Sequence, residues 1–123
     1  MLHSLQMGTH CYIAIEDPDG SVRYIFCHFD GYLRHMVPIL KKDYTTRESV
    51  DALIRAGGIV SLQFKDTPME QHSSPMEFAS NRWEFENEWH HNHVVSYLYI
   101  FTHDDVWKCC CNGHMSLDDI CTF

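Results

Sequence analysis

Three residues in one short block, Cys27, His28 and Asp30, are of the types that form a thiol-dependent active site. A cysteine thiolate attacks an electrophile efficiently when an imidazole lies beside it and a third group orients that imidazole. However, adjacent residues of a strand point to opposite faces, so Cys27 and His28 meet only across a bulge. Because free cysteine is usually buried, we predict that Cys27 belongs to the core, while His28 and Asp30 hydrogen-bond the turn. Tyr32 is expected to pack beside the following helix.

Metal binding is a second chemistry to consider, because the chain holds ten histidines and six cysteines. The residues that could converge on an ion are His90, His91, His93, Cys109, Cys111 and His114. Neither a C-x-x-C pair nor an H-E-x-x-H helix occurs, and these are the spacings that identify many zinc sites. We therefore expect no metal and no other cofactor. If a metal site exists, Cys109, Cys111 and His114 are the residues to test first.

The net charge of −8 is unevenly distributed along the chain. Residues 1–65 hold seven acids and seven bases, whereas residues 66–123 hold ten acids against Arg82 and Lys108. Such a surface repels phosphate backbones, so direct nucleic-acid binding is disfavoured and a protein partner with a basic surface is favoured. The competing interpretation is that net negative charge only keeps a small domain soluble.

Aromatic and acidic residues interleave between residues 83 and 89. Aromatic anchors inside a charged rim are typical of protein interfaces. The competing interpretation, which can hold at the same time, is that the aromatic residues are core and the carboxylates are a solvated face. The candidate partner-binding residues are Trp83, Glu84, Glu86, Glu88, Trp89, Asp104 and Asp105.

The elements that position these residues begin with a hairpin. Apolar residues alternate over 11–16 and 22–27, and the segment Asp17-Pro18-Asp19-Gly20 between them has turn chemistry, which predicts a β-hairpin over residues 11–28. Residues 1–8 are expected to be poorly ordered.

Two helices are predicted after the hairpin. Apolar residues at 33, 36, 37 and 40 form one helical stripe, and Pro38 either kinks that helix or lies in its first turn. The second helix is expected at about residues 46–56, with Thr45 and Glu48 at the spacing of a capping box.

Later runs predict further strands, and the chain as a whole is expected to form one α+β domain over residues 1–123. Strands are expected at 59–64, 94–101 and 106–111, and an acidic edge strand near 82–89 for which a helix is not excluded. A turn at Asn112-Gly113 and a helical turn at 116–119 follow. The predicted fold class is an N-terminal β-hairpin and two helices packed on one face of an antiparallel sheet of about five to six strands.

Two sequence blocks resemble a group of small, largely uncharacterised proteins of tailed phages and bacterial genomes. They are DGSVR at 19–23 and CHFDGY at 27–32, within a match over about residues 9–62 and a looser one at 97–107. Phe29 stands where that group usually has tryptophan, and the cysteine-rich end does not match. The resemblance implies a viral accessory protein and carries no established chemistry.

The compartment follows from what the sequence lacks. We find no apolar run long enough to span a bilayer and no signal peptide at the N-terminus, which favours the bacterial host cytoplasm and reduced cysteines.

The leading functional hypothesis is a phage-encoded accessory protein, not an enzyme, that inhibits or redirects a host protein of defence or nucleic-acid processing. Its acidic second half would be the contact surface, and a homodimer is compatible with it. One alternative is a protein that sequesters a nucleotide signal with Arg23, Arg34 and Lys41. Another is a small metal- or thiol-dependent enzyme around Cys27, His28 and Asp30.

Overall fold

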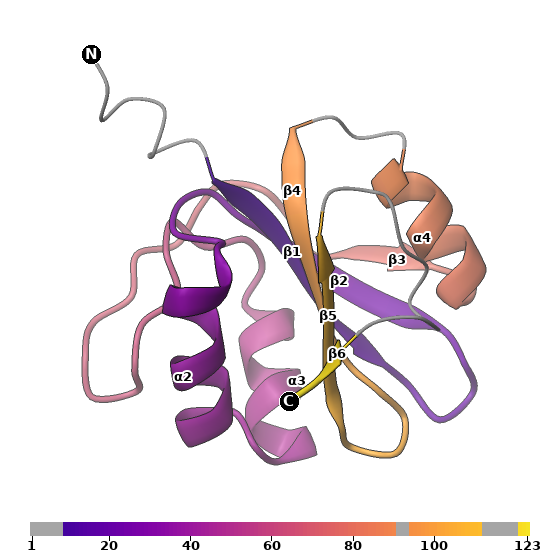
Figure 1. The fold of residues 1–123 in the computed structure, drawn as a ribbon, viewed down its shortest axis with the longest axis horizontal. Coiled ribbons are helices and arrows are strands. Elements are labelled where there is room, and N and C mark those ends of the chain that lie inside the picture. The colour runs from indigo at the N-terminus through magenta and orange to yellow at the C-terminus, as the bar shows by residue number, and fades with distance from the viewer. Residues whose placement is uncertain (1–8, 91–93, 112–120) are drawn as a thin grey trace.

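The computed structural model describes residues 9–90, 94–111 and 121–123, which form a six-stranded sheet with helices on both faces (Figure 1). The elements along the chain are β1 (His10–Glu16), β2 (Val22–Cys27), α2 (Leu33–Asp43), α3 (Arg47–Arg55), β3 (Glu77–Ala79), α4 (Arg82–His90), β4 (Val95–Phe101), β5 (Trp107–Cys111) and β6 (Cys121–Thr122). The predicted α+β class with an N-terminal hairpin is confirmed.

The sheet has the strand order β3-β2-β1-β4-β5-β6. Every neighbouring pair is antiparallel except β1 and β4, which run parallel, so the sheet is mixed where an antiparallel one was predicted. A parallel pair needs a long crossover connection, usually containing a helix. Here all three described helices lie between β1 and β4 in the chain, which meets that requirement.

Helices α2 and α3 cover one face of the sheet, as predicted (Figure 1). Met36, Ile39 and Leu40 of α2 are buried against the strands, and Pro38 lies inside the helix with its ring on the exposed side. In α3 the capping box joins Thr46 and Ser49, one residue later than predicted for Thr45 and Glu48. The Ser49 hydroxyl fills the role that sequence patterns usually assign to glutamate.

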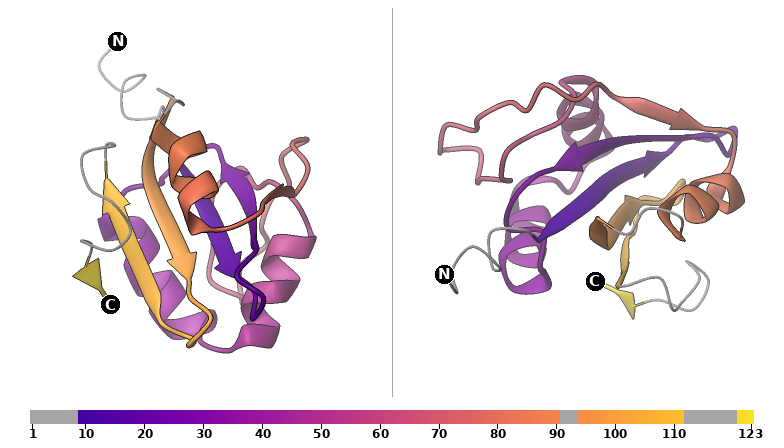
Figure 2. Two further views of the ribbon diagram at one scale, coloured as in Figure 1. Left: turned by 90° about the vertical axis from the view of Figure 1, so that its right-hand side faces the viewer. Right: turned by 90° about the horizontal axis from the view of Figure 1, so that it is seen from above.

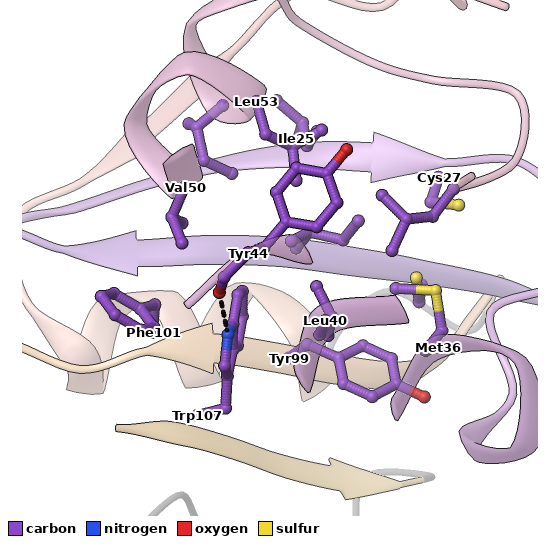
Figure 3. Close-up of a cluster of buried hydrophobic side chains, with 14 of the residues drawn as sticks. Ile25, Cys27, Met36, Leu40, Tyr44, Val50, Leu53, Tyr99, Phe101 and Trp107 are labelled. Atoms are coloured by element: carbon purple, nitrogen blue, oxygen red, sulfur yellow. Dashed lines mark hydrogen bonds between the residues drawn. The ribbon is translucent and has the colours of Figure 1, made fainter. Parts of the chain in front are cut away.

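Side chains alternate between two cores because successive strand residues face opposite sides of the sheet. Cys11, Ile13 and Ile15 of β1 pack under α2 and α3 in the cluster shown in Figure 3, whereas Tyr12 and Ala14 face α4. Figure 2 shows α4 on the face opposite α2 and α3. This third helix replaces the edge strand predicted near residues 82–89.

Two local features explain why that segment is a helix. Phe85 and Trp89 are four residues apart and are both buried on its inner side. Asn81 caps the first turn, because its Oδ1 accepts the backbone N–H of Glu84 at 2.9 Å.

The strand predicted at 59–64 is wrong. Only isolated bridges form there, from Ile59 to Cys27 and to Gln71, because the backbone hydrogen bonds to the end of β2 and the residues after it involve only Ile59 and Val60. The turn at Asn112-Gly113, the helical turn at 116–119 and the lead-in at 1–8 lie outside the described residues. Within the described part, no helix has the length and apolar character needed to cross a bilayer.

Candidate functional site

The outer side of α4 and the neighbouring strand β3 carry exposed carboxylates. We call Glu77, Trp83, Glu84 and Glu88 the acidic α4 surface. All four side chains are exposed. Trp83 is 73% exposed, which is notable because tryptophan is the largest apolar residue type. Burial, reinforced by the charges of Glu77, Glu88 and Glu84, raises the pKa of the Tyr24 hydroxyl well above its usual range. Carboxylates from β3 and α4 therefore gather around one point of the sheet.

The other four predicted partner-binding residues, which are Glu86, Trp89, Asp104 and Asp105, are not part of the acidic α4 surface. Trp89 is only 2% exposed and belongs to the core, so its inclusion in an exposed contact surface is wrong. Glu86 is half-buried. Asp104 and Asp105 lie in the turn between β4 and β5, where Asp105 forms an ion pair with Arg47 at 3.0 Å.

Asp104 is also engaged within its own turn. The Thr102 hydroxyl donates to its carboxylate at 2.6 Å, and that hydrogen bond lowers the pKa of Asp104. These two acids serve the β4–β5 turn and its contact with α3.

The Cys27 to Tyr32 block connects β2 to α2. Cys27 is fully buried on the α2 side of the sheet, and its Sγ donates to the Phe29 carbonyl at 3.3 Å. Asp30 adopts a φ of 61°, and its carboxylate accepts the Ser61 hydroxyl at 2.7 Å. Tyr32 is half-exposed at the start of α2, 6.0 Å from the His35 ring. The core position of Cys27 is therefore confirmed, whereas the prediction that Asp30 bonds its own turn is wrong, because its carboxylate bonds the distant loop at Ser61.

His28 does not serve the turn through its ring, contrary to the prediction. Its side chain lies beside Phe26, which packs on the α4 face, while the Cys27 thiol lies in the opposite core. The imidazole and the thiol are therefore on different sides of the sheet. A thiol-dependent site at Cys27, His28 and Asp30 has no geometric support.

His28 instead belongs to a cluster that sequence reasoning missed. Its ring stacks on His10 with centroids 5.0 Å apart and lies 5.3 Å from His72 and 4.2 Å from Phe29. Phe26 contacts all three imidazoles. His10 donates from Nδ1 to the His28 carbonyl. These residues come from β1, from β2 and the segment that follows it, and from a distant loop, so no local spacing in the sequence predicts the cluster.

The histidine cluster predicts a pH-dependent stability. Burial and the nearby His10 and His72 lower the pKa of His28. The unfolded chain therefore binds more protons than the folded chain at mildly acidic pH, so the free energy of unfolding should fall as pH drops below about 6.5. Urea titrations at about pH 7 and about pH 5 measure this. His28→Phe should make the loss smaller, and an equal loss in that variant would contradict the assignment.

A pair of facing cysteines is the second feature that spacing did not reveal. Cys11 lies directly opposite Cys27 in the β1–β2 hairpin, and both are fully buried. Burial and the adjacent Cys27 sulfur raise the pKa of the Cys11 thiol well above its ordinary value. The Cys11 thiol therefore stays protonated, and both cysteines pack as apolar core residues.

The predicted metal ligands do not come together within the described residues. Cys109 is buried beside Tyr99, whereas the side chains of His90 and Cys111 and all of His91, His93 and His114 lie outside the part described. In that part, no three histidine, cysteine or carboxylate side chains are arranged to hold an ion.

The buried carboxylate of Glu16 connects the end of β1 with α4 and with the turn between β4 and β5. Glu16 is 7% exposed, and its carboxylate lies 3.2 Å from Arg82 Nε and accepts the backbone N–H of His103 at 3.1 Å. Burial opposes ionisation of Glu16, but the hydrogen bonds from His103 and the charge of Arg82 outweigh it and lower the pKa. This network ties the start of α4 to the end of β1.

The bases proposed for nucleotide binding are dispersed. Arg23 is occupied by Asp17 and Asp51, each at 2.7 Å, whereas Arg34 and Lys41 are exposed on α2. No family model, curated protein or solved structure matches the chain. The resemblance to phage proteins therefore stays a prediction.

Proposed function

We propose that this protein is a phage-encoded accessory factor that binds a host protein through the acidic α4 surface and inhibits or redirects it. The observation that carries the proposal is the 73% exposed Trp83 on the same helix as the exposed carboxylates of Glu84 and Glu88. In the described part of the chain, no lysine or arginine forms an ion pair with Glu77, Glu84 or Glu88.

The chemistry of this surface favours a basic partner. Tryptophan is enriched among the residues that dominate binding energy, and it acts best when a partner removes its ring from water. Exposed carboxylates on the same surface accelerate association with a positively charged partner and make that association sensitive to salt. A host protein whose basic surface normally binds nucleic acid has the required complementarity.

The test is affinity capture from host lysate with the wild-type protein and two sets of variants. Trp83→Ala should weaken binding of the captured partner about thirtyfold, which corresponds to about 2 kcal/mol for an anchoring aromatic residue. Glu77→Lys with Glu88→Lys should abolish capture, because like charges would then face each other. Glu84 is left unchanged because its carboxylate accepts the Ser80 N–H at 2.7 Å and supports the start of α4.

The matched control places the same two charge reversals elsewhere. Asp66→Lys with Glu70→Lys changes the net charge equally, in the exposed loop before β3. This control should retain the partner. Circular dichroism should first show that both double variants are folded. Equal capture of the partner by the two variants would then contradict the acidic α4 surface as the binding site.

A further inference from the structure

The hydroxyl of Tyr24 is a polar group in a buried residue that has no hydrogen-bond partner. Tyr24 is 4% exposed, and the centre of its ring lies 5.0 Å from that of Tyr12 and 4.8 Å from that of Phe85. Within the described residues, the Tyr24 hydroxyl neither donates nor accepts a hydrogen bond. Because the O–H of a buried tyrosine usually has a partner, this unused group points to something that binds there.

The oxygen of this hydroxyl can be reached from solvent. In the described part of the chain, the side-chain oxygen and nitrogen atoms that are closed off from solvent without a hydrogen-bond partner do not include it. Since the hydroxyl has no partner, the small part of Tyr24 that remains exposed includes this oxygen. A hydrogen-bond donor can therefore approach the oxygen without displacing the core around the ring.

Three carboxylates lie near this hydroxyl. Glu77 of β3 is directly opposite Tyr24 of β2, so the two side chains stand on the same face of the sheet. Helix α4 lies beside β3 (Figure 1), and its Glu84 and Glu88 flank Phe85, whose ring contacts Tyr24. Burial first, and then the charges of all three carboxylates, keep the pKa of the hydroxyl above its usual range. A protonated hydroxyl is thus held among negative charges.

This arrangement suits a cation with several donors better than a metal ion. Among the described residues, no three carboxylate, histidine or cysteine side chains are placed to hold one ion. Glu84 already accepts the Ser80 N–H at 2.7 Å, whereas Glu77 and Glu88 have no partner in the described part. A guanidinium is planar and has five N–H donors, so it can bond two carboxylates and a hydroxyl oxygen together. An ammonium has three donors on one compact nitrogen.

We propose that the acidic α4 surface receives an arginine side chain of its partner, whose guanidinium donates to the Tyr24 hydroxyl and to the carboxylates of Glu77 and Glu88. This inference rests on the proposed function, because it names the group by which a basic host protein engages that surface. The ring of Tyr24 is fixed in the core before the partner arrives. An acceptor that is already in place loses less conformational entropy on binding than one on a mobile side chain.

The experiment compares labelled hexa-arginine amide and hexa-lysine amide, which carry equal charge, by fluorescence anisotropy with the full-length protein. Wild-type protein should bind hexa-arginine about fivefold more tightly than hexa-lysine, because only the guanidinium has enough donors. Tyr24→Phe removes the hydroxyl and leaves the ring in the core. This variant should bind hexa-arginine about fivefold more weakly, as expected for the loss of one hydrogen bond, and should bind the two peptides equally.

Tyr97→Phe is the matched control. Tyr97 packs against the core on the α2 side of the sheet, so loss of its hydroxyl should change hexa-arginine binding less than about twofold. Urea unfolding should give Tyr24→Phe the same midpoint as wild type, because no hydrogen bond within the described residues is lost. Equal binding of hexa-arginine by wild type and Tyr24→Phe, or equal binding of the two peptides by wild type, would overturn the arginine contact.

Capture of the host partner separates this inference from the proposed function. Suppose that Glu77→Lys with Glu88→Lys loses the partner while Tyr24→Phe binds it as tightly as wild type. The acidic α4 surface then stands as the binding site, and the arginine contact at Tyr24 is overturned. If the charge-reversed protein also retains the partner, the proposed function itself fails.

Discussion

Trp89→Ala should lower the free energy of unfolding by about 4 kcal/mol, the cost of removing a buried aromatic side chain. Trp89 is 2% exposed and packs with Phe85 against Tyr12 and Tyr24 of the sheet. Its removal leaves a cavity under the only helix described on that face. Urea denaturation followed by circular dichroism measures the change.

Trp83→Ala provides the control within the same helix. Because its side chain is 73% exposed, its removal should change the free energy of unfolding by less than about 0.5 kcal/mol. The two tryptophans thus separate stability from binding, since Trp83→Ala is expected to weaken binding of the partner without unfolding the protein. Similar destabilisation by both variants would mean that α4 packs in some other orientation.

Gly31→Ala should lower the free energy of unfolding by about 3 kcal/mol, at the upper end of typical overpacking costs. A Cβ at position 31 would lie 2.8 Å from Cys11 Cβ and 3.0 Å from Cys11 N. Those atoms belong to the central strand β1 and cannot move aside as a flexible side chain would. The Gly31 carbonyl also accepts the buried Tyr99 hydroxyl at 2.8 Å, a bond that a shifted backbone would strain.

Gly20→Ala tests whether any glycine substitution has the same effect. Gly20 has a φ of +90°, and a Cβ at this position would have no heavy atom within 4 Å, so its cost is only the dihedral penalty of about 1 kcal/mol. Thermal or urea unfolding of both variants gives the comparison. A Gly31→Ala protein as stable as Gly20→Ala would show that β1 and the turn after β2 are not in close contact.

Sequence patterns predicted the elements whose signals are local. The period-two alternation around Asp17–Gly20 predicted the hairpin, and the capping-box spacing of Thr45 and Glu48 predicted a helix at the position of α3. The segment 82–90 was ambiguous, because its interleaved aromatic residues suit a strand as well as a helix. The burial of Phe85 and Trp89, together with the Asn81 cap, shows that the helical period is the correct one.

The features missed from the sequence depend on tertiary contacts. His10, His28 and His72 meet only after β1, β2 and a later loop come together. The pairing of Cys11 with Cys27 likewise requires the register of the hairpin. Trp83 and Trp89 are chemically identical in the sequence, and only the rotation of α4 about its axis exposes one and buries the other.

The parallel pairing of β1 with β4 also has a consequence for biosynthesis. During translation, β1 and β2 leave the ribosome first, and the neighbour on the other side of β1 is made only after all three described helices. Until β4 has been synthesised, the backbone N–H and C=O groups along that edge of β1 lack their final hydrogen-bond partners. Exposed strand edges of this kind pair with other chains. Nascent chains that stall before β4 should therefore aggregate or require a chaperone, whereas chains released after β4 should not.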